Sequence, residues 1–127
     1  MSPRSAEFMT QARKRLDGAR DALTSGHPDL GTSAAYYAML YAARAALSER
    51  NLYAKTHGGV WSRFSEAFVA NGIFDRELFR EATAAQKTRE LGDYEAQPAS
   101  AQLAGQIIES ADRFVRAIAE MLGDPGS

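Results

Sequence analysis

Hydrophobic residues recur along most of the chain at the spacing of an amphipathic helix. Gly, Pro, Asn and Asp interrupt this pattern at a few points, and no segment shows the sustained alternation of a β-strand. The pattern therefore predicts an all-α fold, an antiparallel bundle of about five helices with short connections. The predicted helices are residues 7–24, residues 29–49, a segment that follows 55–59 and ends at 71–75, a segment from about 75 into 91–100, and a segment that begins after Ser100.

The second predicted helix differs from the others because it is apolar on nearly every face. Its middle reads SAAYYAMLYAARAAL, residues 33–47. A helix of this kind must pack on several sides, so we expect it to lie at the centre of the bundle. The other helices carry one apolar stripe each: Val60, Trp61, Phe64, Ala67 and Phe68 on the third, Leu78, Ala82 and Ala85 on the fourth, and Leu103, Ile107, Ala111, Phe114, Ile118 and Met121 on the fifth.

Composition restricts the classes of function. A chain of 127 residues is expected to form one domain over 1–127, with an ordered core of about 5–122 and short flexible tails. A net charge of −1 excludes a global basic field for nucleic acid, so any RNA or phosphate binding must come from a local patch. No apolar run reaches the roughly 20 residues of a membrane span. The absence of cysteine fits a reducing cytoplasm, and two distant histidines predict neither a metal site nor a cofactor.

Arg89 stands where the inner stripe of the fourth helix should be apolar. Asp93 lies four residues further on, and Tyr94 beside it offers a hydroxyl. A guanidinium on a core-facing stripe needs partners, because an unpaired buried charge is very costly. The pair is either a helix-end salt bridge or part of a ligand site. Because Arg before Asp is the weaker orientation for an isolated pair at this spacing, the second interpretation stays open.

Tyr37, Tyr41 and Arg44 form a stripe on the second helix. Two aromatic rings and an arginine on one face can stack a base and hold a phosphate. Taken alone, the stripe favours the other interpretation, in which the tyrosines are core aromatics and the charged end of the arginine reaches solvent.

The segment KTHGG, residues 55–59, precedes the third helix. Thr56 is predicted to be its N-cap, so the amides that follow would be free at the helix start. Together with the helix dipole and Lys55, these amides would form an anion site beside His57. The alternative is a capped helix whose His57 only touches a neighbour.

Four motifs occur in a fixed order: SAAYYAMLYAARAAL, then KTHGGV, then FVANGIF, then RELGDYEA. In this order they resemble the HEPN-domain family, and more narrowly a small prokaryotic branch of it, over about residues 5–122. The resemblance implies an all-α bundle that commonly forms a homodimer. Many HEPN domains act as metal-independent RNA endonucleases, or as toxins paired with a minimal nucleotidyltransferase antitoxin. Others bind without catalysis.

The catalytic signature of that family is an arginine followed a few residues later by a histidine. Arg50 with His57 and Arg20 with His27 both fit the spacing, but they lie around early loops, whereas the family motif lies late in the bundle. The late segment is RELGDY, with Asp93 near the position where an active member more usually has histidine. An aspartate exchanges protons poorly near pH 7.

Three hypotheses follow. The first is an RNA- or nucleotide-binding or toxin–antitoxin component that partners a nucleotidyltransferase, without evident catalysis. The second is a metal-independent ribonuclease, and the third is a helical dimerisation or adaptor module. The candidate catalytic residues are Arg89, Asp93 and His57, and the candidate ligand-binding residues are Tyr37, Tyr41, Arg44, Lys55, Thr56 and Tyr94.

Overall fold

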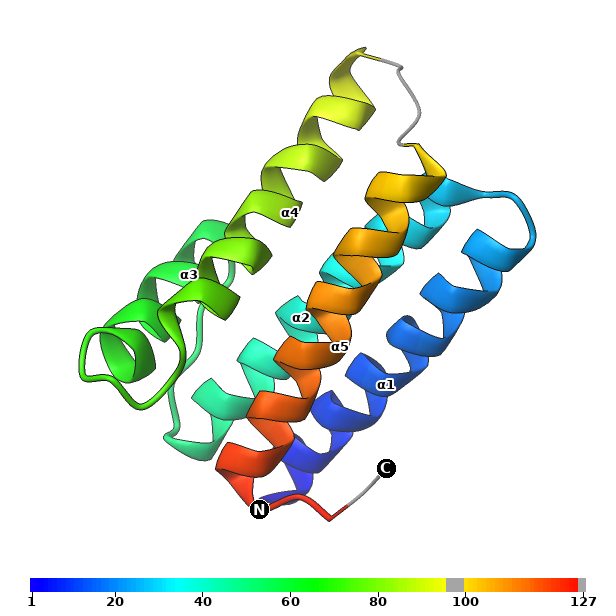
Figure 1. The fold of residues 1–127 in the computed structure, drawn as a ribbon. Coiled ribbons are helices and arrows are strands. Elements are labelled where there is room, and N and C mark those ends of the chain that lie inside the picture. The colour runs from blue at the N-terminus through cyan, green and yellow to red at the C-terminus, as the bar shows by residue number, and fades with distance from the viewer. Residues whose placement is uncertain (96–99, 126–127) are drawn as a thin grey trace.

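The computed structural model describes residues 1–95 and 100–125, and for residues 93–95 it describes the backbone only. Within these ranges every regular element is a helix and none is a strand, so the all-α prediction is confirmed (Figure 1). The elements in chain order are α1 (Pro3–Thr24), α2 (Pro28–Glu49), α3 (His57–Phe64), the π-helical turn η1 (Ser65–Val69), α4 (Arg76–Glu95) and α5 (Ala101–Leu122).

Helix α2 lies at the centre of the bundle, as its all-round apolar sequence predicts. It packs against α1, α3, α4 and α5, and α1 also packs against α5. Tyr36, Met39 and Leu47 of this helix are almost completely buried. In Figure 1, α1, α2 and α5 run side by side, and α4 lies on the flank with α3 beside its first turns.

Local signals explain where the helices begin. Thr56 and Ser100 cap α3 and α5, each accepting a hydrogen bond from the amide three residues further on. The predicted start of the first helix at residue 7 is too late. Ser2 caps α1 in the same way, and Pro3 fits its first turn, where an amide hydrogen is not needed.

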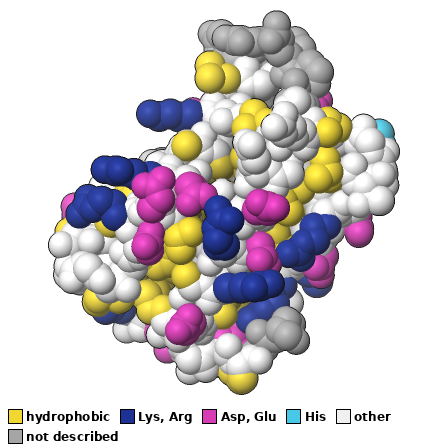
Figure 2. Space-filling view, viewed as in Figure 1, with side chains coloured by type: hydrophobic (Ala, Val, Ile, Leu, Met, Phe, Trp, Pro, Cys, Tyr) yellow, Lys and Arg dark blue, Asp and Glu magenta, His cyan; other side chains and the backbone are white. Residues whose placement is uncertain are grey.

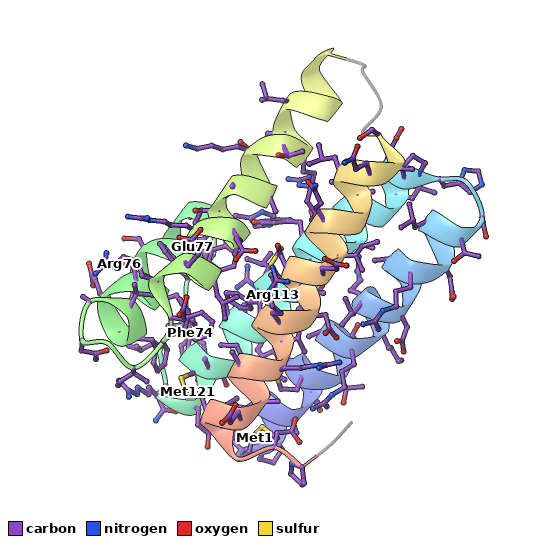
Figure 3. The ribbon with its side chains drawn as sticks, viewed as in Figure 1. Met1, Phe74, Arg76, Glu77, Arg113 and Met121 are labelled. Carbon is purple, nitrogen blue, oxygen red and sulfur yellow. The ribbon has the colours of Figure 1, made fainter. Side chains whose placement is uncertain are left out.

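An aromatic cluster joins α3 to α4 and α5. Phe64 lies with its ring centroid 6.2 Å from Phe79 of α4 and 5.7 Å from Phe114 of α5, and Trp61 stands edge-on to Phe114 at 5.9 Å. Phe74 is buried just before the start of α4 (Figure 3), whereas Arg76 and Glu77 in the first turn of that helix are exposed. This cluster fixes the position of α3, and with it the position of His57 at its first residue.

The face in view in Figure 2 carries both signs of charge in alternation, with apolar side chains between them. Arg113 of α5 pairs with Glu81 of α4 at 2.7 Å, and Arg20 of α1 pairs with Asp112 of α5 at 2.9 Å. Asp124, which follows the end of α5, pairs with Arg13 of α1. The opposite charges within each pair neutralise each other across the helices, so this face has no electrostatic field of one sign.

Candidate functional site

The start of α3 forms a tight capping turn. The Oγ1 atom of Thr56 accepts a hydrogen bond from the Gly59 amide at 2.9 Å. A Cβ atom added at Gly59 would lie 2.9 Å from that same oxygen and 3.2 Å from the Cβ of Ala54, whereas one at Gly58 would meet nothing within 4 Å. The predicted N-cap is therefore present, and Gly59 is required by the turn itself. Gly58 leaves the first turn of the helix open to solvent.

Tyr36 of α2 links two side chains of α3. Its hydroxyl oxygen accepts a hydrogen bond from Nε1 of Trp61 at 3.1 Å and lies 3.2 Å from Nδ1 of His57. Tyr36 has an exposed fraction of 0% and Trp61 of 4%, whereas His57 is half-buried. The buried hydroxyl of Tyr36 thus contacts a half-buried histidine at the edge of the core.

Arg89 of α4 covers the same place from the other side. Its guanidinium carbon lies 5.4 Å from the ring centroids of both Tyr36 and Tyr37, and its Nε atom is buried. The ring of Tyr37 stands edge-on to His57 at 5.7 Å. We call Tyr36, Tyr37, His57, Trp61 and Arg89 the Tyr36–Arg89 cluster. It assembles from three helices, and Arg89 and His57 are 32 residues apart in the chain.

The electrostatics of the cluster favour a neutral histidine. Burial, followed by the positive charges of Arg89 and Arg44, lowers the pKa of His57, and Glu90 opposes this only in part. Burial likewise raises the pKa of Tyr36, although its hydrogen bond from Trp61 and the charge of Arg89 act in the opposite direction. At neutral pH the cluster therefore holds a neutral imidazole beside fixed cations.

The predicted stripe on α2 has mixed surroundings. Arg44 donates a hydrogen bond to the Ala54 carbonyl at 2.9 Å and so holds the segment that leads into α3. Tyr41 stacks on Phe8 at 6.2 Å, and Arg15 of α1 lies 5.4 Å from the ring of Tyr37 and 5.5 Å from that of Tyr41. Of the three residues, Tyr37 belongs to the cluster, while Tyr41 and Arg44 border it.

The remaining candidate residues divide into two groups. Lys55 and Thr56 are exposed and immediately precede His57. The side chains of Asp93 and Tyr94 lie outside the described residues, although both positions belong to α4. The predicted pairing of Arg89 with Asp93 therefore stays a prediction.

The sequence did not single out three residues of this region: Tyr36 and Trp61, which belong to the cluster, and Arg15, which borders it. A usable signal was present for two of them. His57 and Trp61 are four residues apart on one helix, so their ring nitrogens lie on one face. A buried tyrosine in an all-apolar helix needs a hydrogen-bond partner, and Tyr36 is that tyrosine. The contacts of Arg15 had no local signal.

The two arginine–histidine spacings have separate structural explanations. Arg50 lies 4.5 Å from the ring centroid of Phe68 and donates to the Ala67 carbonyl at 3.2 Å. Arg20 pairs with Asp112, and His27 is exposed in the connection between α1 and α2. Arg89, from the late segment of the chain, lies over the rings of both Tyr36 and Tyr37 beside His57.

Over residues 1–92 and 100–125, whose side chains the structure describes, no three His, Asp or Glu side chains come together in a way that would hold a metal ion. Over the same residues, no helix combines the length and the apolar character needed to cross a membrane.

Comparison with known proteins gives the family. The HEPN domain matches residues 5–122, and the chain therefore belongs to the HEPN-domain family. It is 35% identical over 124 residues to UPF0332 protein glr0978 of Gloeobacter violaceus, covering 96% of this chain and 98% of that protein.

Two relatives from Methanocaldococcus jannaschii are named "Putative toxin MJ0142" and "Putative toxin MJ0605". The first is 30% identical over 90 residues, which are 71% of this chain and 61% of that protein. The second is 34% identical over 88 residues, which are 69% of this chain and 66% of that protein. The matches to these two relatives thus cover a little less than two thirds of their lengths.

Proposed function

We propose that this protein binds RNA or a nucleotide through the Tyr36–Arg89 cluster, and that it is the toxin-like component of a pair whose partner is a minimal nucleotidyltransferase. Membership of the HEPN family and the names of the two Methanocaldococcus jannaschii relatives support the toxin-like role. Lack of cysteine is consistent with action in a reducing cytoplasm.

A single observation carries the binding proposal: Arg89 and His57 converge on the same two tyrosines. A guanidinium is suited to phosphate, because its planar array of donors matches two phosphate oxygens. The half-buried ring of Tyr37 offers an aromatic group close to that cation, and base stacking on such rings contributes about 1–3 kcal/mol per base. The open first turn of α3 adds amides and the positive end of a helix dipole.

The test is binding of a short fluorescein-labelled single-stranded RNA, followed by fluorescence polarisation in EDTA. Arg89→Ala is expected to weaken binding at least tenfold, which corresponds to about 1.4 kcal/mol. Arg80→Ala is the matched control, because it removes the same charge from the same helix at a side chain that is 68% exposed. Equal affinity of the two variants would contradict the assignment of the site. Binding should also weaken as salt rises.

Metal-independent RNA cleavage is the second candidate. Its specific support is the neutral His57 beside Arg89 and Arg44, since such a histidine can accept a proton while the cations stabilise a charged phosphorane. Incubation of RNA with the protein in EDTA, followed by electrophoresis, tests it. Cleavage that disappears in both His57→Ala and Arg89→Ala would establish this activity. A protein that neither binds nor cleaves RNA, yet forms a stable dimer, would instead be a dimerisation or adaptor module.

A further inference from the structure

Three ring groups form a hydrogen-bonded chain that runs from the core to the surface. Nε1 of Trp61 lies 3.1 Å from the hydroxyl oxygen of Tyr36, and that oxygen lies 3.2 Å from Nδ1 of His57. Tyr36 has an exposed fraction of 0%, so its hydroxyl has no contact with solvent. Over the residues whose side chains the structure describes, Trp61 and His57 are the two polar partners of this hydroxyl.

Proton counting decides the direction of these hydrogen bonds. An indole nitrogen can only donate, so the Tyr36 oxygen accepts from Trp61. Tyr36 has a single proton of its own, and the Nδ1 atom of His57 is the acceptor within reach. In the reverse arrangement Nδ1 would donate to Tyr36, and the tyrosine proton would be buried without an acceptor. Buried donors without acceptors are rare because they are costly.

We propose that Tyr36, held in place by Trp61, is a positioning residue that keeps His57 in the tautomer with its proton on Nε2. His57 then meets a ligand as a neutral hydrogen-bond donor, and a phosphate oxygen is the acceptor that fits. The assignment of the ligand rests on the function proposed above, whereas the assignment of the tautomer does not.

The charged and titratable groups around the ring agree with a neutral imidazole. Burial and two cations lower the pKa of His57, and one carboxylate opposes them. These groups come from each element that packs near the ring: Arg89 and Glu90 from α4, Arg44, Tyr36 and Tyr37 from α2, and Lys55 from the segment before α3.

The tautomer of His57 decides between two roles for this residue, proton abstraction as a general base and anion binding as a hydrogen-bond donor. A general base needs a free lone pair on the nitrogen that faces the substrate. With Nδ1 engaged by Tyr36 and a proton on Nε2, the neutral ring has no free lone pair and offers an N–H instead. The hydrogen bond from Tyr36 therefore favours anion binding by His57 over proton abstraction.

The test is a long-range ¹H–¹⁵N correlation spectrum of ¹⁵N-labelled ligand-free protein, recorded well above the titration midpoint of His57. Protonated and unprotonated ring nitrogens have well-separated ¹⁵N shifts. We expect Nε2 to be the protonated nitrogen in at least roughly tenfold excess, because about that ratio corresponds to one hydrogen bond of a buried group. A spectrum in which Nδ1 carries the proton would overturn the proposal, and this result needs no variant.

Tyr36→Phe removes the hydroxyl and keeps the ring. We expect the excess of the Nε2–H tautomer to fall towards that of histidine in a short peptide, and the midpoint of His57 to rise, because the hydroxyl stabilises the neutral ring. Tyr37→Phe is the matched control, because it removes a neighbouring hydroxyl from a ring that contacts His57 only edge-on. An unchanged tautomer ratio and midpoint in a folded Tyr36→Phe protein would overturn the proposal.

Adding a 5′-phosphorylated dinucleotide tests the second half of the inference. We expect a change in the Nε2 resonance while Nδ1 stays unprotonated. Loss of the Nε2 proton on binding would overturn the donor role. If the RNA-binding experiment fails in the wild-type protein, the proposed function falls, and the spectrum of the ligand-free protein still decides the tautomer.

Discussion

The guanidinium carbon of Arg89 lies 5.4 Å from the ring centroid of Tyr36, so a cation of α4 covers a completely buried ring of α2. Because the hydroxyl of the same tyrosine contacts His57, the cation and the histidine are joined through one side chain. The pKa of His57 therefore depends on Arg89, a residue far from it in the chain.

Removing Arg89 should raise the pKa of His57. Arg89→Ala takes away a positive charge that disfavours the protonated ring, so the NMR midpoint of His57 should move upward. The loss of two cation–π contacts should also lower the free energy of unfolding by about 1–2 kcal/mol. Arg80→Ala should leave the midpoint unchanged. A downward shift in Arg89→Ala would contradict the cationic environment described for His57.

His57 should make stability depend on pH in a defined window. Its folded-state pKa lies below the unfolded value of about 6.5, so the unfolded chain binds more protons between the two values. The free energy of unfolding should therefore be unaffected by His57 above about pH 6.5 and should decrease as pH falls through the window. Urea unfolding at a series of pH values measures this decrease.

The control for this window is the second histidine. His57→Gln should remove the decrease, whereas His27→Gln, which changes an exposed residue, should keep it. A decrease that persists in His57→Gln would assign it to other groups.

Two adjacent glycines should respond differently to the same substitution. Gly59→Ala places a Cβ atom 2.9 Å from the Thr56 oxygen, so it should disturb the N-cap and cost about 1–2 kcal/mol of unfolding free energy. Gly58→Ala meets nothing within 4 Å and should be neutral or stabilising by up to about 1 kcal/mol, because alanine favours helix. Thr56→Ala should cost about 1 kcal/mol. Urea unfolding of the three variants checks the turn, and equal effects of the two glycine variants would argue against it.

An anion bound at the start of α3 should act on His57. Phosphate or a nucleotide should raise the pKa of His57, because a nearby negative charge favours the protonated ring. An NMR titration with and without ligand measures the shift. Lys55→Ala should reduce the shift, and added salt should reduce it further. Identical titration of His57 in both conditions would leave residues 55–59 as a cap and a turn alone.

The chain should form a homodimer. The family resemblance suggests this, and large apolar side chains such as Leu30 and Leu91 are exposed by 63% and 58%. Sedimentation equilibrium at about tens of micromolar should give twice the monomer mass. A clean monomer at that concentration would contradict the prediction.

The helices and their ends follow from local sequence. Thr56 and Ser100 cap helices because each side chain bonds an amide only three residues away, and such a contact needs no other part of the fold. The central place of α2 follows in the same way from an apolar sequence that has to be covered on every side. The order and the type of the four sequence motifs likewise indicated the HEPN-domain family, and the domain match over residues 5–122 confirms it.

The cluster depends on contacts between helices, and periodicity within one helix cannot rank them. The spacing of Tyr37, Tyr41 and Arg44 predicts a shared stripe, but it does not say that the neighbouring Tyr36 is the ring that meets His57, Trp61 and Arg89. The sequence by itself determined which helices form, where they are capped and which of them is central, because those features depend on short-range hydrogen bonds and on the need to bury apolar faces. Only the tertiary structure decided that Arg89 reaches His57 through Tyr36, because that meeting depends on how the aromatic cluster sets α3 and α4 against α2.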